Sequence, residues 1–329
     1  MFSQIIGREE MVQNLRRAIR VGKVAHAYLV EGERGSGKMM LARAFAQALQ
    51  CEKHDGDSCD ECPSCKRALG NNHPDIIYVT HEKPGLISID EIRTQLVSDA
   101  QIRPYYGNHK VYIVRDAQKM NEATQNALLK TLEEPPAYVV ILLLTDNPLA
   151  LLETVRSRCE LLYLKPIRDD LVEKYLMEQL KIPDYQAGLC RAFAQGSLGR
   201  AIELARSEDF AKLKETALQV TAHTGDMDLG RISQLAKEMA PFKATVSDFF
   251  DLLTVWYRDV LCVKATGSAN ELIFRDEQGA LRAAARTHAY EGIEQILRAI
   301  ERARRRVDAN VNYELAMEEL FMTMKENSN

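Results

Sequence analysis

The sequence has 329 residues, and its 43 lysines and arginines against 47 aspartates and glutamates give a formal net charge of −4. The length exceeds what a single hydrophobic core usually organises, so we expect two or three domains. A near-neutral, slightly acidic charge argues against a basic nucleic-acid binder that acts alone, although a local basic face would be compatible with it.

The sequence contains no apolar stretch long enough to span a membrane. Its N-terminal residues carry charges where a signal peptide has an apolar core, so we expect a cytoplasmic protein. In that compartment seven cysteines indicate metal binding or burial rather than disulfides. The first predicted element is a helix over residues 4–19, where apolar residues recur with helical spacing.

A glycine-rich turn follows a short apolar run that predicts a buried strand at 27–30. Gly32, Gly35 and Gly37 precede Lys38, and a helical pattern then continues to about residue 49. A strand, a GxxxxGK turn and a helix in this order are typical of a phosphate-binding loop, or P-loop, in which backbone N–H groups and the lysine hold the anion. The alternative is a plain glycine turn between a strand and a helix.

The residue after this lysine is Met39, at the position where a serine or threonine normally binds Mg²⁺. A thioether cannot replace a hydroxyl group as a ligand of this hard cation. We therefore expect a loop that is suited to holding phosphates and poorly suited to hydrolysing them.

Four cysteines follow the predicted helix with the spacing C-x7-C-x2-C-x2-C: Cys51, Cys59, Cys62 and Cys65. Two adjoining C-x2-C steps bring three thiolates within reach of one ion, and the first cysteine completes a tetrahedron. This pattern predicts structural zinc; the alternatives are a redox pair or free thiols. Catalytic zinc does not fit, because four cysteines leave no position for water. His54 and His73 are further ligand candidates that we interpret as ordinary loop residues.

Strands alternate with helices through the next hundred residues. Apolar runs predict strands at 75–79, 111–114, 139–144 and 161–164, and helical spacing predicts helices at 89–101 and 121–132. Near-continuous apolar strands are typical of a parallel sheet that helices cover on both faces. The sequence therefore predicts an α/β domain over residues 1–165, with a zinc module at 51–65.

The third predicted strand ends in Arg115 and Asp116. In a P-loop ATPase this place holds an Asp-Glu pair, which binds the metal and orients the attacking water. An arginine in the metal-ligand position repels Mg²⁺, and Asp116 is shorter than the glutamate it replaces. This is a second departure from the hydrolysing pattern, independent of Met39.

From residue 166 onward the pattern predicts helices only. We expect a small helical domain at 166–208 and a larger one at 209–329. Trp256 has the spacing of a core residue. An arginine cluster lies in the predicted helix at 289–308, and we favour a solvated helix face over nucleic-acid contact for it. Its members are Arg302, Arg304, Arg305 and Arg306.

Four features together resemble the clamp-loader proteins of the bacterial replicative DNA polymerase, which belong to the AAA+ superfamily. They are the AHAYLVEGERGSGK loop, the cysteine cluster, NALLKTLEEPP, and RSRC ahead of a helical domain. The resemblance covers the whole chain. It implies an AAA+ nucleotide-binding domain, a helical lid at 166–208 and a helical collar at 209–329 that mediates oligomerisation.

Within that family the departures at Met39 and Arg115 point away from the active ATPases of gamma/tau type. Their lid carries an arginine directly after Gly-Ser-x, whereas here Arg200 falls one place late after Gly196 and Ser197. The pattern resembles the delta-prime type of subunit, which does not hydrolyse ATP. Whether the altered loop binds ATP or ADP is left open.

The resemblance also implies a role for Arg158 of the RSRC motif. In such a subunit this arginine reaches the ATP site of a neighbour and stabilises charge on the γ-phosphate, as an arginine finger in trans; the alternative is a structural salt bridge. The implied partners are gamma/tau and delta subunits, the sliding clamp and primed DNA. Two other functions remain open: an active gamma/tau-type ATPase and an autonomous zinc-dependent nucleic-acid binder.

Overall fold

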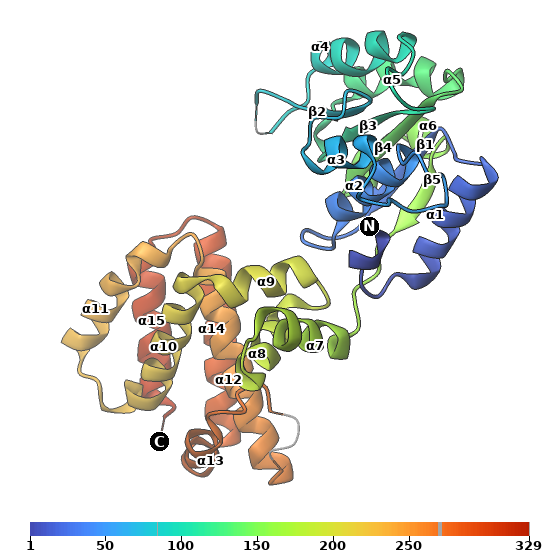
Figure 1. The fold of residues 1–329 in the computed structure, drawn as a ribbon. Coiled ribbons are helices and arrows are strands. Elements are labelled where there is room, and N and C mark those ends of the chain that lie inside the picture. Colours follow the sequence, from blue (N-terminus) through green and yellow to red (C-terminus); the bar gives the residue numbers. More distant parts are fainter. Residues whose placement is uncertain (84, 269–271, 329) are drawn as a thin grey trace. The chain divides into compact units, whose positions relative to one another are not determined.

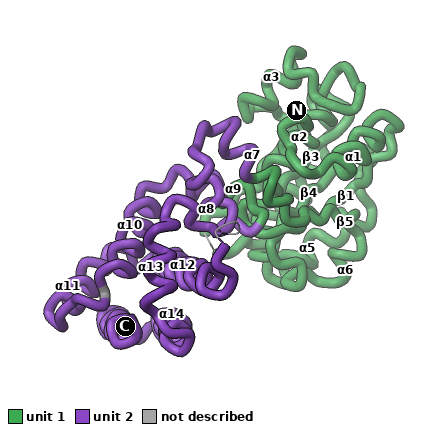
Figure 2. The backbone as a smooth tube through the Cα atoms, turned by 90° about the horizontal axis from the view of Figure 1, so that it is seen from below, with its two compact units in different colours: residues 1–172, 196–200 green, residues 173–195, 201–329 purple. Residues whose placement is uncertain are grey.

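The computed structural model describes residues 1–83, 85–268 and 272–328 (Figure 1). The chain separates into two compact units (Figure 2). Unit 1 comprises residues 1–172 and 196–200, and unit 2 comprises residues 173–195 and 201–329. The predicted lid and collar boundaries at 166, 208 and 209 do not coincide with this division and stay a prediction.

Unit 1 is built on a parallel five-stranded sheet with the strand order β2-β3-β4-β1-β5. The strands are β1 (Ala27–Glu31), β2 (Ile76–Val79), β3 (Lys110–Val114), β4 (Val139–Thr145) and β5 (Glu160–Tyr163). The predicted parallel α/β sheet is thus confirmed. Because all the strands run in the same direction, the loops that follow β1, β3 and β4 emerge at one edge of the sheet.

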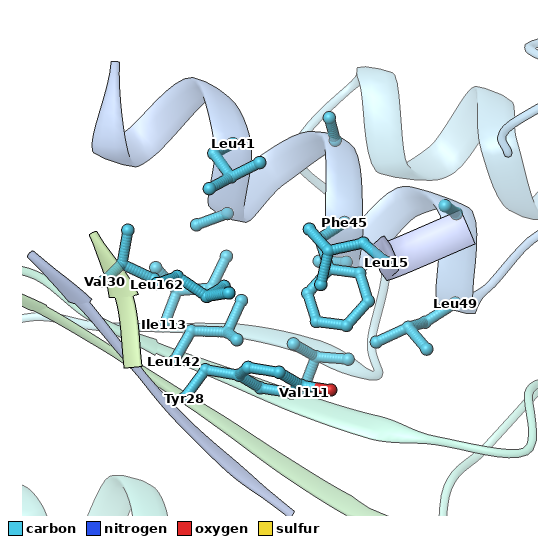
Figure 3. Close-up of a cluster of buried hydrophobic side chains, with 14 of the residues drawn as sticks. Leu15, Tyr28, Val30, Leu41, Phe45, Leu49, Val111, Ile113, Leu142 and Leu162 are labelled. Atoms are coloured by element: carbon cyan, nitrogen blue, oxygen red, sulfur yellow. The ribbon is translucent and has the colours of Figure 1, made fainter. Parts of the chain in front are cut away.

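Helices cover both faces of the central strands. Along β4, Leu142 belongs to a buried cluster with α1 (Glu9–Val21) and α2 (Lys38–Leu49), as Figure 3 shows. The next residue, Leu143, belongs to a second buried cluster on the opposite face. That face is covered by α4 (Ile89–Ile92) and α5 (Glu122–Glu133). The alternation follows from the two-residue period of a strand.

The edge strand β5 departs from the expected burial on both faces. Leu161 and Tyr163 are 56% and 46% exposed, whereas Leu162 is buried between them. An edge strand has a neighbour on one side only, and an apolar sequence does not reveal which strand takes the edge.

The predicted helix at 89–101 is helical throughout but not uniformly α-helical. A capping box of Ser88 and Glu91 starts α4, which continues as a π-helix (Arg93–Ser98) and a 3₁₀ turn (Asp99–Gln101). Unit 1 also contains α3 (Pro63–Leu69), α6 (Glu153–Arg156) and short 3₁₀ turns. Those turns are Phe2–Gln4, Ala117–Lys119 and Pro148–Ala150.

Unit 2 is helical wherever it has regular structure. Its helices are α7 (Asp169–Leu180), which begins in unit 1, α8 (Asp184–Ala194), α9 (Leu198–Arg206), which also begins in unit 1, α10 (Glu208–His223), α11 (Leu229–Glu238), α12 (Val246–Thr266), α13 (Gln278–Thr287), α14 (Tyr290–Asp308) and α15 (Tyr313–Glu326). Two 3₁₀ turns, Thr224–Asp226 and Ala240–Phe242, connect some of them. Trp256 is 4% exposed and stacks edge-on against Phe274, as its helical spacing predicted for a core residue. Among the described residues, no helix is long and apolar enough to cross a membrane.

Each arginine of the α14 cluster pairs with a neighbouring carboxylate. Arg304 pairs with Asp251 of α12 at 2.6 Å, and both Arg302 and Arg306 pair with Glu319 of α15. Arg305 pairs with Glu301 one turn earlier on its own helix. These pairs favour the ion-paired, solvated face over a nucleic-acid contact.

Candidate functional site

The glycine-rich loop leaves β1 and ends at Gly37, directly before α2. Gly35 and Gly37 have φ values of +78° and +94°, a region that side chains other than hydrogen rarely allow. The Lys38 ammonium donates to the carbonyl oxygens of Gly32 at 2.6 Å and Glu33 at 2.8 Å. Strand, loop and helix therefore have the arrangement that the sequence predicted for a phosphate-binding loop.

Burial lowers the pKa of Lys38, against the opposing pull of nearby Asp146, Asp116 and Glu33, which raise it. Removing the ammonium from water disfavours its charged form, and the carboxylates favour that form. An anion that replaced the two loop carbonyls as a partner would add a further favourable charge interaction.

Residues 196–200 hold the glycine-rich loop in place. The Gly199 N–H donates to the Gly35 carbonyl at 3.0 Å, and the Ser197 hydroxyl donates to the Arg34 carbonyl at 3.0 Å. A Cβ on Gly199 would meet the Gly35 oxygen at 2.7 Å, so the two backbones approach more closely than any larger residue permits. Sequence reasoning missed this contact; the glycines at 196 and 199 were its only signal.

A cavity of about 620 Å³ opens beside the loop. Met39 lines it at the start of α2, so the residue that stands in place of a hydroxyl ligand does face this space. The loops after β3 and β4 complete the wall. Its charged lining residues are Arg34, Lys38, Arg115, Asp116, Lys119 and Asp146.

The residues after β3 differ in their partners. Asp116 has a φ of +50° and accepts a bond from Lys119 at 3.0 Å, so its carboxylate is already paired. The exposed Arg115 guanidinium has no carboxylate partner within the described part of the chain. Sequence reasoning singled out this pair of residues but did not assign a role to Lys119, in the 3₁₀ turn that follows Asp116, or to Asp146, in the loop after β4.

The four predicted metal-binding cysteines come together. All four Sγ atoms of Cys51, Cys59, Cys62 and Cys65 lie within 4.8 Å of one another. Zinc–sulfur bonds of about 2.3 Å place the sulfurs of a tetrahedral site roughly 3.8 Å apart, so the cluster fits a closed zinc site. The N–H groups of Cys62 and Cys65 point at the sulfurs of Cys59 and Cys62, as N–H groups around thiolates do.

The segment that carries these cysteines is attached to α1. Asp57 pairs with Arg16 at 2.5 Å and also accepts the N–H of Phe2 at 3.1 Å. Burial raises the pKa of Asp57, but the bonds from Phe2, Arg16 and Ser58 outweigh it and hold the pKa below its usual range. The cysteine segment thus contributes to fixing the N-terminal helix.

Neither candidate histidine belongs to the sulfur cluster. His73 is buried, and its Nε2 lies 2.9 Å from the Ser64 hydroxyl. His54 lies exposed in the loop after Cys51. This agrees with the interpretation of both as loop residues.

Arg158 lies just before β5 and does not line the cavity described above. Its guanidinium pairs with Glu133 at 2.7 Å and donates to the Thr154 carbonyl at 2.8 Å. Both side chains of the ion pair are accessible, at 35% and 50% exposed. Glu133 belongs to the NALLKTLEEPP segment, so two motifs that are 25 residues apart in the sequence meet at this pair.

Cys159, next to Arg158, packs against the buried core, and burial raises the pKa of its thiol to about 12.

Comparison with known proteins gives consistent matches over both units. Residues 7–168 match the family described as DNA polymerase III, delta subunit, and residues 226–326 match its C-terminal counterpart. The chain is 29% identical over 318 residues to the DNA polymerase III subunit delta' of Bacillus subtilis, which covers 95% of this chain and 94% of that protein. It is 31% identical over 237 residues to the delta' subunit of Escherichia coli, which covers 70% of this chain and 69% of that protein.

Another relative is the DNA polymerase III subunit tau of Bacillus subtilis. It is 30% identical over 244 residues, which make up 71% of this chain and 43% of tau. The chain therefore spans less than half the length of that relative.

Proposed function

The chain belongs to the family of DNA polymerase III delta' subunits, and we propose that it works as a clamp-loader subunit that does not hydrolyse ATP itself. It would assemble with gamma/tau-type and delta-type subunits, and the assembly would place a sliding clamp on primed DNA. In this proposal residues 1–165 form the AAA+ nucleotide-binding-like domain, 166–208 the lid and 209–329 the collar that holds the partner subunits.

One observation carries the non-hydrolysing role: Met39 and Arg115 line the same cavity beside the glycine-rich loop. Hydrolysis by a P-loop enzyme needs a hydroxyl and a carboxylate as Mg²⁺ ligands at these two places. A thioether offers the wrong donor, and a guanidinium repels the ion. Both departures thus affect one site, and neither could compensate for the other.

Arg158 is the residue that we assign to catalysis by the neighbouring subunit. Its planar, permanently charged guanidinium can donate two parallel bonds to a γ-phosphate. The exposed ion pair with Glu133 supports this role, since such pairs contribute at most about 1 kcal/mol and are readily exchanged for a phosphate. Zinc bound by the four cysteines would have a structural role. It would stabilise the segment after α2 and, through the ion pair of Asp57 with Arg16, the position of α1.

A reconstituted loader tests this function. With gamma/tau and delta subunits, clamp and primed DNA, Arg158→Ala should lower the ATPase rate by about a thousandfold or more, as for other arginine fingers. Arg158→Lys should rescue it poorly, because an ammonium lacks the planar fork. Arg168→Ala, another exposed arginine of unit 1, is the matched control and should leave the rate unchanged. Unchanged activity of Arg158→Ala would rule out the role in trans.

The second candidate is an active gamma/tau-type ATPase, which is favoured by the intact glycines of the loop and by the match to tau. In that case the isolated chain would turn over ATP, and Lys38→Ala would abolish the turnover. The first candidate predicts no such turnover to abolish.

A further inference from the structure

The cavity beside the glycine-rich loop has an unusual charge balance for a place where Mg²⁺ would be bound. Four cationic side chains line it, Arg34, Lys38, Arg115 and Lys119, against two carboxylates, Asp116 and Asp146. One of those carboxylates, Asp116, is already neutralised by Lys119 at 3.0 Å. The cavity thus presents a surplus of positive charge without any metal ion.

Two of the cations are available for a ligand. Within the described residues, neither the Arg34 nor the Arg115 guanidinium pairs with a carboxylate, and both are exposed to solvent. Lys38 is held by two carbonyl oxygens, which are weaker partners for an ammonium than a phosphate oxygen would be. The N-terminus of α2, with the N–H groups of the loop ahead of it, adds further attraction for an anion.

The size and walls of the cavity suit a polyphosphate. A volume of about 620 Å³ falls within the range of small-molecule sites, roughly 300–1,000 Å³. Gln118 also lines it, and its buried Oε1 has no hydrogen-bond partner among the described residues. Unpaired polar groups of this kind occur where a ligand or water completes the bonding.

We propose that this cavity binds the polyphosphate chain of a nucleotide without a divalent cation, with Arg115 supplying the positive charge that Mg²⁺ supplies in a hydrolysing P-loop protein. Arg115 therefore has two effects: it repels Mg²⁺ from the site, and it attracts the phosphate anion that Mg²⁺ would otherwise help to bind. This inference rests on the proposed function only in treating residues 32–38 as a nucleotide loop that has lost its metal ligands.

Calorimetric titration of the full chain tests this inference, with ATP, ADP and inorganic tripolyphosphate as probes, each in EDTA and in excess Mg²⁺. We expect ATP to bind in EDTA at least as tightly as in Mg²⁺. Arg115→Ala should weaken binding in EDTA about tenfold to a hundredfold, the range for losing one bond between charged groups. Arg17→Ala, an exposed arginine on α1, is the control and should bind like the original chain.

Arg115→Asp gives a second, opposite test, because it places a carboxylate at the position where a hydrolysing P-loop protein has its metal ligand. ATP binding in EDTA should be lost, and Mg²⁺ should now strengthen binding rather than leave it unchanged. Thermal unfolding followed by circular dichroism verifies that each variant is folded; if Arg115→Asp is not, Arg115→Ala and Arg115→Gln decide the question. Tripolyphosphate binding as tight as ATP binding would assign the site to the phosphate chain alone.

Three results would overturn the inference: no binding of any probe in EDTA, a strict requirement for Mg²⁺, or full affinity in Arg115→Ala. None of them bears on Arg158, whose role is read from the ATPase rate of the assembled loader. Conversely, if Arg158→Ala leaves the ATPase rate of the loader unchanged while the chain still binds ATP in EDTA, the proposed function is rejected and the assignment of this cavity holds.

Discussion

The ion pair between Arg158 and Glu133 holds the arginine that we propose acts on a partner subunit. The guanidinium has a carboxylate at 2.7 Å and a backbone carbonyl at 2.8 Å, yet both ends of the ion pair are reached by solvent. Water screens such a pair, so separating its charges costs little. Glu133 therefore positions Arg158 in the isolated chain without trapping it.

Replacing Glu133 tests this interpretation. Glu133→Gln should change the free energy of unfolding by less than about 1 kcal/mol, measured by urea denaturation. The reconstituted loader should keep most of its ATPase activity, because the carboxylate takes no part in the reaction. Glu134→Gln, its exposed neighbour, is the control. A loss as large as that of Arg158→Ala would instead make Glu133 part of the catalytic arrangement.

His288 in unit 2 gives a prediction on pH dependence. Burial lowers the pKa of His288, and nearby Lys264 lowers it further, while the bond to the Ala284 carbonyl acts in the opposite direction. The unfolded chain has a histidine pKa of about 6.5, so as the pH falls the unfolded state takes up the proton first. The contribution of His288 to stability is therefore complete above that pH and is lost below it.

Denaturant unfolding at pH 7.5 and pH 5.5 measures this effect. The original chain should lose more unfolding free energy on acidification than His288→Gln, whose side chain does not titrate. Burial also lowers the pKa values of His73 and His109, so both proteins should still lose some stability. Equal losses in the two proteins would show that His288 takes up its proton equally well in the folded state.

At the scale of elements, most of the strands could be predicted because they are near-continuous apolar runs, and most of the helices because their apolar residues recur with a period of 3.6. The strand β4 and the helix α5 were located to within about a residue for this reason. Short helices such as α3 and α6 were not predicted, because one or two turns are too short to show a helical period. The π-helical segment after α4 was invisible too, since its apolar spacing is close to that of an α-helix.

The contact between residues 196–200 and the glycine-rich loop predicts a strict need for glycine at position 199. Gly199→Ala places a Cβ at 2.7 Å from the Gly35 oxygen and should destabilise the protein by about 1–3 kcal/mol, as overpacking does. Gly279→Ala on α13 is the matched control, because nothing lies within 4 Å of its Cβ position. There alanine should be neutral or stabilising. Equal melting temperatures in calorimetry would contradict the close approach.

The cysteine segment predicts a metal-dependent N-terminal region. The purified chain should contain one zinc ion per molecule by atomic absorption, and Cys62→Ser should reduce that content. Chelation should lower the melting temperature and expose the amides of α1 to hydrogen exchange, because Asp57 connects the segment to Arg16. Cys262→Ser, outside the cluster, should retain the metal. A full zinc content in Cys62→Ser would contradict the site.

At the scale of the whole molecule, candidate functional residues were easier to predict from the sequence than the residues that hold them in place. The glycine-rich loop and the four cysteines were singled out by residue type and spacing, and Arg158 by the resemblance of its RSRC motif to a known family. Their partners, Gly199, Arg16 and Glu133, were not, because each is brought in by a segment 25 or more residues away. A motif records which groups a site needs, whereas the residues that hold those groups in place depend on the complete fold.

We propose that this chain has lost its own metal chemistry and supplies a guanidinium to a partner subunit that has kept it. The most direct measurement is the ATPase rate of the purified chain alone, in saturating ATP and Mg²⁺, beside a gamma/tau-type subunit under the same conditions. We predict no turnover above that of Lys38→Ala. A rate comparable to the gamma/tau-type subunit, abolished in Lys38→Ala, would contradict the account.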